Sequence, residues 1–431
     1  MKDIQCTARN GRISVYKYDT DRFKSENITV YFSLPSSREK SVARSLLLSV
    51  LKRGTEKYPT QKHINERLDE LYATLVNLKN QKFDNVQLLG ISVDVIYSSY
   101  TESGEDLLFD ALEVLSQMIY HPNFDKETGN FRKEYIESEK ENYKSIILSQ
   151  INEPRTYAAI RCREEMFASL NVLERLDTMC DKIESVTDEE IYNCYLELIN
   201  ESKILVFYVG NRSADEICEQ IEKMVTVCCD EHNYTDETRP KLLKSVDEPN
   251  VIIESSDISQ GRLVMGLNCG VTWCDEDYYA MLLCNEILGA SPVSKLFMNV
   301  REALSLCYEC SSIYNSARGA IFVTTGIDSD NFELARDAIF AQIQDIQNGK
   351  ISETEFLAAK KSILNVYSAV ADSTNAIERF YLGRIVNGID TDISEFIEKI
   401  DALTMEQVVE AAKKLTAHTI YFLRGEGDND E

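Results

Sequence analysis

Residues 204–209 read Ile-Leu-Val-Phe-Tyr-Val, and residues 263–267 read Leu-Val-Met-Gly-Leu. Short apolar runs of this kind, bounded by turn residues, predict buried β-strands. The stretch between them is polar and rich in turn residues, which is typical of a connection between domains. We therefore predict two domains, residues 1–229 and 251–431, joined by a linker at 230–250.

The same order of elements is predicted on both sides of this linker. In the first half we expect strands and helices in the order strand 28–34, a helix ending at Gly54, strand 86–95, helix 105–118 and a strand ending at Gly210. In the second half we expect strand 262–268, a helix ending at Gly289, strand 321–327, helix 331–347 and strand 419–423. The glycine pairs 54 and 289, 90 and 326, and 210 and 425 are 235, 236 and 215 residues apart. This nearly constant offset indicates an internal duplication.

Strands mixed with runs of consecutive helices indicate an α+β fold. We expect each half to form a mostly antiparallel sheet with helices packed on one face. A doubly wound parallel sheet needs stricter alternation of strand and helix and ranks second. Ser36 with Glu39, and Ser352 with Glu355, both fit the capping box that begins a helix.

The composition narrows the class of protein. The chain has 431 residues, 46 Lys and Arg against 72 Asp and Glu, and a net charge of −26. This charge argues against nucleic-acid and anionic-membrane partners and suits a basic peptide. The first residues lack the apolar core of a secretory signal, and no run approaches the roughly 18–20 apolar residues of a membrane span. Because the twelve cysteines are dispersed, we expect them to be reduced in a cytoplasmic protein.

No self-sufficient catalytic centre can be assembled from spacing alone. The four histidines (His63, His121, His232 and His418) include no pair three or four residues apart, as a zinc-binding helix requires. In Cys307-Tyr308-Glu309-Cys310, we predict a strand whose two cysteines face opposite sides, which makes a cysteine-ligated zinc site unfavourable. Glycine-rich phosphate loops and the G-x-S-x-G nucleophile turn are also absent from the sequence.

The predicted helix at 42–54 and the turn Arg53-Gly54-Thr55 carry a family resemblance. This stretch resembles the start of a pitrilysin/insulinase-type zinc peptidase, in which an H-x-x-E-H helix runs into a basic-Gly-Thr turn. The resemblance places the two zinc-binding histidines at Ser45 and Ser49, and the general base at Leu48. A serine hydroxyl is a poor zinc ligand and leucine cannot accept a proton, so the resemblance implies a vacated zinc centre.

The remaining positions of that centre do not replace the histidines. The resemblance places the third zinc ligand in the helix at 131–147, which contains Glu137, Glu139 and Glu141. The matching positions of the second half are Ala280, Leu283 and Cys284. We therefore expect no cofactor in this chain, with zinc held by a partner.

A second segment, residues 288–308, resembles the C-terminal half of the same family, where an arginine and a tyrosine seven residues apart reach the substrate. By this resemblance Arg301 holds a substrate carbonyl and Tyr308 helps to stabilise the tetrahedral oxyanion. The alternative is that Arg301 caps a helix end and Tyr308 is a half-buried strand aromatic. The resemblance also suggests a peptide-binding edge strand, which we place near Tyr72-Ala73-Thr74-Leu75.

Residues 257–266 further resemble the zinc-free subgroup of bacterial peptidase-like proteins associated with elongation factor P modification. In split members of the family, two such chains close like a clamshell around an unfolded peptide. The resemblance thus implies a non-catalytic subunit that pairs with a zinc-bearing homologue. A binding scaffold without proteolytic function is the main alternative, a homodimer is left open, and an active stand-alone protease fits least.

Overall fold

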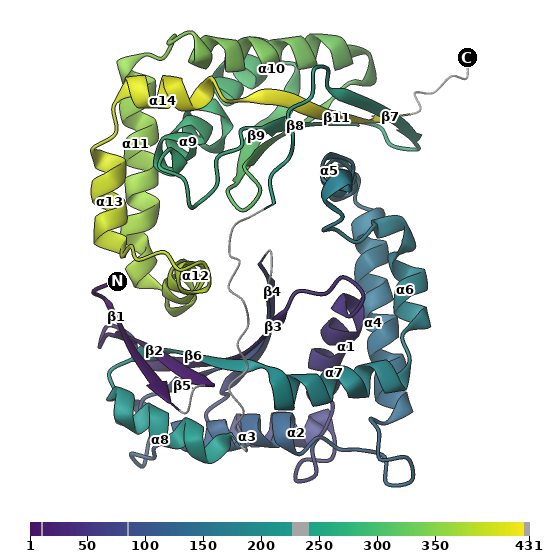
Figure 1. Cartoon of the computed structure of the whole chain (residues 1–431), viewed down its shortest axis with the longest axis vertical. Helices are drawn as coiled ribbons and strands as arrows, with labels where there is room; N and C mark the ends of the chain where they lie inside the picture. Colours follow the sequence, from purple (N-terminus) through teal and green to yellow (C-terminus); the bar gives the residue numbers. More distant parts are fainter. Residues whose placement is uncertain (10–11, 84–85, 226–240, 426–431) are drawn as a thin grey trace. The chain divides into compact units, whose positions relative to one another are not determined.

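A computed structural model describes residues 1–9, 12–83, 86–225 and 241–425, which form two compact units (Figure 1). The first unit comprises Met1–Ser145, Met179–Thr238 and Val370–Asp392. The second comprises Ile146–Thr178, Arg239–Ala369 and Ile393–Glu431. The predicted linker falls partly on residues 226–240, which lie outside the described residues, as does His232.

The first unit is built on a six-stranded sheet with the order β1-β2-β6-β3-β5-β4. Its strands are β1 Ile4–Arg9, β2 Ile13–Asp19, β3 Ser25–Pro35, β4 Leu75–Lys82, β5 Val86–Ile96 and β6 Lys203–Gly210. All neighbours are antiparallel except β2 and β6, which run parallel. The central strands β3 and β5 are almost continuously buried because both of their faces are covered.

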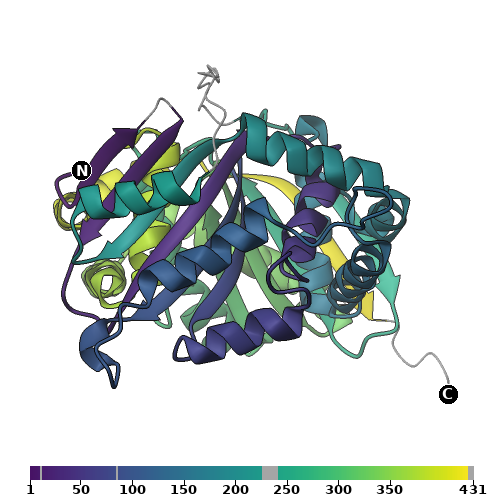
Figure 2. The same ribbon diagram turned by 90° about the horizontal axis from the view of Figure 1, so that it is seen from below.

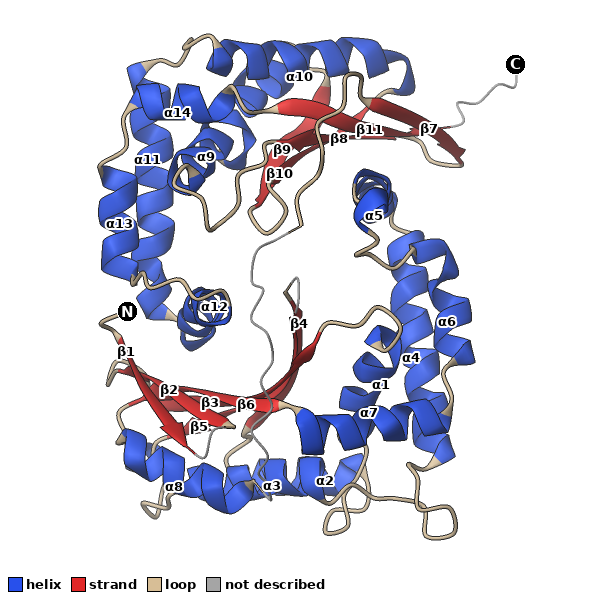
Figure 3. Cartoon of the chain, in the orientation of Figure 1, coloured by secondary structure: helices blue, strands red, loops and turns tan. Residues whose placement is uncertain are grey.

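Helices cover one face of this sheet, as Figures 2 and 3 show for α2, α3 and α8. The helices of the unit are α1 Ser41–Leu51, α2 Gln61–Glu70, α3 Leu108–Tyr120, the first part of α4 Lys133–Ile151, α6 Met179–Ser185, α7 Asp188–Glu201 and α8 Ala214–Met224. In α3 the buried residues Leu108, Ala111, Leu112 and Leu115 recur at helical spacing. This apolar stripe fixes the face that the helix turns toward the sheet.

The opposite face is covered by α12, Thr374–Val386, which comes from the C-terminal half of the chain. Leu382 of α12 packs in a buried cluster with Tyr31 and Leu88 of the sheet. The hydroxyl of Tyr31 donates a hydrogen bond of 2.5 Å to Glu378, which also pairs with Lys79. The buried carboxylate of Glu378 therefore binds two side chains of the sheet and holds α12 against it.

The second unit repeats the plan with a five-stranded sheet of order β7-β11-β8-β10-β9. Its strands are β7 Asn250–Ser256, β8 Gly261–Asn268, β9 Cys307–Asn315, β10 Ala320–Ile327 and β11 Thr416–Gly425. Only β7 and β11 are parallel. The order matches β2-β6-β3-β5-β4 of the first sheet, position by position. The predicted α+β class and the mostly antiparallel sheets are confirmed.

On one side of this sheet lie several helices, as Figure 3 shows for α9, α10 and α14. The helices of the unit are α9 Tyr278–Asn285, α10 Phe332–Gln347, α11 Glu353–Ser368, α13 Ile393–Asp401 and α14 Met405–Ala412. The segments η4 Glu286–Ala290 and η5 Leu296–Ala303 are π-helical. The predicted capping box at Ser352 and Glu355 is confirmed, with the Glu355 amide donating to the Ser352 hydroxyl at 3.2 Å.

The other face of the second sheet receives α5, Pro154–Met166, from the N-terminal half. Cys162 and Met166 of α5 pack with Val264, Phe322 and Tyr421 in one buried cluster. Each unit therefore takes a helix from the opposite half of the sequence. The prediction that helices pack on one face of each sheet was incomplete, because this added helix covers the second face. The division of the sequence into halves at residues 229 and 251 remains a proposal. The compact units differ from these halves, because residues 146–178 belong to the second unit and residues 370–392 to the first.

One predicted helix start is wrong. Ser36 follows β3 directly and Glu39 lies in the turn at 38–40, while α1 begins at Ser41 with no side-chain cap. The Ser37 hydroxyl instead accepts a hydrogen bond from the Lys40 amide at 3.3 Å, which continues the turn. Within the described parts of the chain, no helix combines the length and the apolar character needed to cross a bilayer.

Candidate functional site

Helix α1 is the helix that the family resemblance assigns to zinc binding. Its apolar residues Leu46, Leu47 and Leu51 are buried, which anchors the helix in the first unit. After the helix the chain turns at Gly54, where an added Cβ would lie 2.5 Å from the carbonyl oxygen of Pro59. Only glycine fits against this backbone atom, so the Arg-Gly-Thr turn has a steric cause.

The three positions that the family resemblance assigns to the zinc centre differ in their surroundings. Ser45 donates a hydrogen bond of 2.9 Å to the Ser41 carbonyl and accepts one of 2.9 Å from the side chain of Asn80 on β4. Leu48 is 3% exposed and belongs to the core, while Ser49 is half-buried. This helix offers no imidazole or carboxylate at the three positions where the family would need them.

The glutamates of α4 are held by cations of the chain. Glu139 pairs with Arg53 of the Arg-Gly-Thr turn, and Arg53 also donates to the Ser138 hydroxyl at 2.9 Å. Glu137 pairs with Lys140 at 3.5 Å, and Glu141 pairs with Lys144 at 2.5 Å. Among the described residues, no group of three histidine, cysteine or acidic side chains is arranged to hold a metal ion.

The matching positions of the second half lie in α9 and are buried: Ala280, Leu283 and Cys284. Burial raises the pKa of the Cys284 thiol to about 12, so it is a protonated core residue at neutral pH. A metal-binding thiolate is not available at this position.

The predicted edge strand begins later than expected. Tyr72 and Ala73 have φ angles of 57° and 58°, in the left-handed region, and lie in the turn that follows α2. Thr74 is buried and donates to the Leu71 carbonyl at 2.7 Å, so β4 starts only at Leu75. A left-handed backbone at two non-glycine residues is rare, which explains why the sequence did not predict this turn.

Strand β4 is nevertheless at the edge of its sheet, because it pairs only with β5. Leu75 is 63% exposed at its start. Lys52, at the end of α1, donates to the backbone carbonyl of Val76 at 3.1 Å. Together with the Asn80–Ser45 bond, this contact ties the vacated helix to the edge strand.

Arg301 and Tyr308 lie on neighbouring elements of the second unit. Arg301 is in the last turn of η5, with its guanidinium carbon 4.4 Å from the ring centre of Phe297 and a nitrogen 3.3 Å from Glu302. Tyr308 is 86% exposed on the edge strand β9. The alternative interpretation of Tyr308 as a half-buried aromatic is therefore wrong. Within the described residues its hydroxyl has no hydrogen-bond partner.

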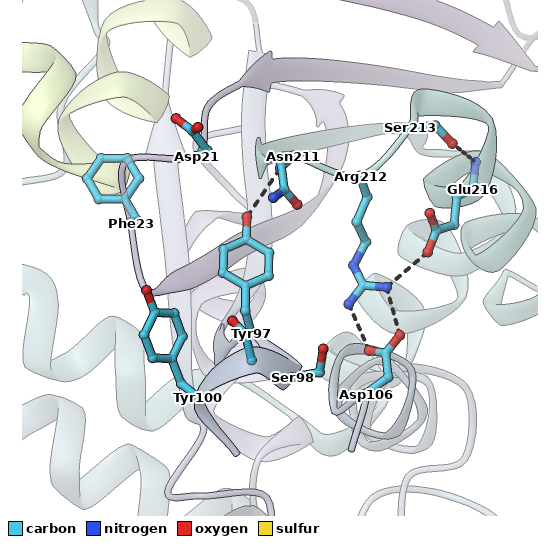
Figure 4. Close-up of a pocket in the computed structure, with 11 residues that line it drawn as sticks. Asp21, Phe23, Tyr97, Ser98, Tyr100, Asp106, Asn211, Arg212, Ser213 and Glu216 are labelled. Carbon is cyan, nitrogen blue, oxygen red and sulfur yellow. Dashed lines mark hydrogen bonds and ion pairs between the residues drawn. The ribbon is translucent and has the colours of Figure 1, made fainter. Parts of the chain in front are cut away.

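Sequence reasoning missed a pocket of about 520 Å³ in the first unit, shown in Figure 4. Its central side chain, Arg212, follows strand β6 and pairs with Glu26 and Asp106 at 2.7 Å and with Glu216 at 2.9 Å. A hydrogen bond from Arg212 lowers the pKa of Asp106. Because the charge of Arg212 is matched by these carboxylates, the pocket offers no free cation for an anionic ligand.

Comparison with known proteins places this architecture. The sequence model described as "Peptidase M16 inactive domain" matches residues 185–363. A Bacillus subtilis protein named probable inactive metalloprotease YmfF is 27% identical over 423 residues, covering 97% of each chain. The uncharacterized zinc protease YmxG of the same organism is 21% identical over 317 residues, covering 71% of this chain and 72% of its own.

Solved structures agree with this placement. A conserved protein from Enterococcus faecalis V583 superposes with a TM-score of 0.90 at 26% identity, covering 99% of this chain and 100% of the other. A Pseudomonas fluorescens structure described as a peptidase M16 inactive domain has the same fold, with a TM-score of 0.76 at 16% identity and 98% coverage of both chains.

The chain is thus similar in sequence and fold to members of the M16, or pitrilysin/insulinase-type, peptidase family that are described as inactive. One of these relatives is named as inactive, and helix α1 of this chain carries Ser45, Leu48 and Ser49 where the family resemblance places the zinc-binding and catalytic side chains. The functions of Arg301, Tyr308 and the β4 edge remain predictions.

Proposed function

We propose that this chain is the non-catalytic subunit of a heteromeric M16-type peptidase. A zinc-bearing homologous subunit supplies the metal and the general base, and this chain helps to bind and position an unfolded peptide. The observation that carries the proposal is the exposed Tyr308, whose hydroxyl is unbonded and which stands on an edge strand close to Arg301 in the sequence. An exposed tyrosine hydroxyl is free to donate a hydrogen bond to a bound substrate.

The chemistry of the two residues suits peptide hydrolysis in trans. When zinc-activated water attacks a peptide carbonyl, negative charge develops on the carbonyl oxygen. A tyrosine hydroxyl donates to that oxyanion, and an arginine donates to a neighbouring substrate carbonyl. The stacking of Arg301 on Phe297 restricts the guanidinium before the substrate arrives, which lowers the entropy lost on binding.

Two sheet edges support the binding of an extended peptide. Among the described strands, β4 and β9 each pair with a single neighbour, so each lies at the edge of its sheet. A peptide added to such an edge is held by main-chain hydrogen bonds, which demand little of its sequence. The net charge of −26 favours a peptide that contains lysine or arginine.

The proposal includes a heterodimer in the cytoplasm. Its association with elongation factor P modification rests on the resemblance of residues 257–266 to that subgroup. A homodimer is the competing assembly, and it can be distinguished by the mass of the purified chain in solution.

The experiment is to purify the chain alone, a zinc-bearing M16 homologue alone, and the two mixed. Each sample is assayed for cleavage of an unstructured, lysine-containing peptide and for bound zinc. We expect cleavage above the level of either protein alone only in the mixture, with zinc bound to the homologue. Cleavage by the homologue alone at the rate of the mixture contradicts the proposal.

A binding scaffold without proteolytic function is the second candidate. It is favoured by the bonds from Asn80 to Ser45 and from Lys52 to Val76, which stabilise a vacated helix against a free edge. This candidate predicts peptide binding by the chain alone and a mixture with no gain in cleavage.

A further inference from the structure

Strand β9 contains a bulge at its start, where it pairs with β10. Cys310 lies opposite Thr325, and Cys307 lies opposite Ile327. Two residues of β9, Tyr308 and Glu309, therefore face a single residue of β10, Gly326. In a regular strand, residues three apart point to opposite faces. One extra residue reverses this relation.

The two cysteines therefore lie on the same side, and the prediction that they face opposite sides is wrong. The two thiols are close enough to affect each other's ionisation, and Thr325, opposite Cys310, donates its hydroxyl to the Glu309 carbonyl at 2.8 Å. Cys310 is 4% exposed, whereas Cys307 is half-buried and can be reached from solvent. Reagents can therefore reach the thiol of Cys307, whereas the thiol of Cys310 is buried.

The surroundings distinguish the two thiols chemically. The hydrogen bond from Cys310, aided by Thr325 and the charge of Arg301, lowers the pKa of Cys307 to about 7 against the opposing effect of burial. The hydrogen bond to Cys307 and burial raise the pKa of Cys310 above its ordinary value. At neutral pH Cys307 is the nucleophilic thiolate, and Cys310 remains a protonated thiol, as in reactive cysteine pairs.

A metal site does not account for this pair. A tetrahedral zinc site needs two further ligands, and the described residues contain no group of three suitable side chains around the two thiols. The side chain of Glu309 is held by Arg155 at 2.8 Å and by Arg262 at 3.3 Å.

We propose that Cys307 and Cys310 are an oxidisable dithiol that closes reversibly into a disulfide across the β9 bulge when the protein meets hydrogen peroxide. The Cys307 thiolate attacks a peroxide oxygen, forming a sulfenic acid and releasing hydroxide. The Cys310 thiol then attacks the Cys307 sulfur, forming the S–S bond and releasing water. Two thiols are oxidised and one peroxide is reduced, and an added dithiol reverses the reaction.

Closure encloses Tyr308 and Glu309 in the ring. The edge residue that reaches the substrate in the proposed function is then part of a covalently fixed loop, so oxidation is expected to lower the activity of the mixture. This consequence rests on the proposed function, whereas formation of the disulfide does not.

The test uses the full-length chain, reduced, freed of reductant and treated with increasing hydrogen peroxide at pH 7. Remaining thiols are alkylated and the protein is digested with trypsin without reduction. Both cysteines fall in the single tryptic peptide 302–318, which contains no other cysteine. We expect mass spectrometry to show this peptide unalkylated and lighter by two hydrogens, and fully alkylated after treatment with a dithiol. Cys307→Ser should abolish the change, and Cys274→Ser, which alters an exposed cysteine of the same unit, should not.

Two results overturn the inference: both cysteines alkylated after peroxide treatment, or oxidation of Cys307 to sulfinic acid without closure. Failure of the proposed function is distinguishable, because a reduced mixture that does not cleave peptide leaves the disulfide result unchanged. Conversely, an active reduced mixture with no disulfide after oxidation contradicts only the dithiol.

Discussion

The side chain of Asn80 donates a hydrogen bond of 2.9 Å to the hydroxyl of Ser45, the position that the family resemblance assigns to a zinc-binding histidine. The amide of an edge strand thus fills the space beside the vacated helix. This polar contact joins α1 to β4.

We predict that Leu48→Glu, which restores the family's general base, destabilises the protein. Leu48 is 3% exposed, and an unpaired carboxylate at such a position costs several kcal/mol of desolvation. The expected loss is about 3–5 kcal/mol in the free energy of urea unfolding. Leu48→Met, the matched control, should cost less than about 1.5 kcal/mol. Equal stability of the Glu and Met variants would show that this position is open to water.

A second prediction concerns the helix that the first unit takes from the C-terminal half. Glu378 of α12 is 1% exposed and serves both Tyr31 and Lys79. Glu378→Ala leaves the lysine without its counter-ion and should cost about 3–5 kcal/mol. Hydrogen exchange should accelerate in α12 and β3.

The control for this variant is Asp372→Ala, which removes an ion pair between Asp372 and Arg22. Both of these side chains are more than half exposed. Exposed pairs contribute at most about 1 kcal/mol. Similar exchange rates in the two variants would mean that Glu378 does not anchor the helix.

A third prediction follows from the environment of Cys307. Its pKa of about 7 lies below the ordinary thiol value, and the thiolate is the nucleophile. The rate of alkylation at Cys307 should therefore rise with pH, with a midpoint near pH 7. In Cys310→Ala the first cause of the lowered pKa is removed, so the midpoint should move to higher pH. An unchanged profile in that variant contradicts the assigned hydrogen bond.

A fourth prediction concerns Arg301. Lysine keeps the charge but loses the planar, forked donors and the stacking on Phe297. Arg301→Lys should raise the KM of the mixed subunits for peptide more than it lowers kcat, because the arginine binds the substrate in both the ground state and the transition state. A fall in kcat with KM unchanged would assign Arg301 to the transition state alone.

Much of the fold could be predicted from the sequence because its signals are local. The apolar runs that became β6 and β8 and the capping box at Ser352 each depend on a few consecutive residues. Two of the glycine pairs, Gly90 with Gly326 and Gly210 with Gly425, lie in corresponding strands of two sheets with the same strand order.

Three features could not be predicted because they depend on the tertiary structure. The exchange of α5 and α12 between units depends on which sheet face each helix covers, and this pairs residues as distant as Tyr31 and Glu378. The bulge in β9 is visible only in the register with β10, since Tyr308 and Glu309 have no special sequence signal. The left-handed turn at Tyr72 and Ala73 likewise lacks a glycine.

The most direct test of the central claim is the kcat of the mixed subunits when this chain carries Tyr308→Phe. The change removes one exposed hydroxyl and should leave the association of the subunits unchanged. Loss of one oxyanion donor should lower kcat by about 10²–10³-fold. Tyr100→Phe, an exposed tyrosine of the first unit, should have no effect. A mixture that contains the Tyr308→Phe chain and cleaves peptide at the full rate would contradict the assignment of this chain as a subunit that supports catalysis in trans.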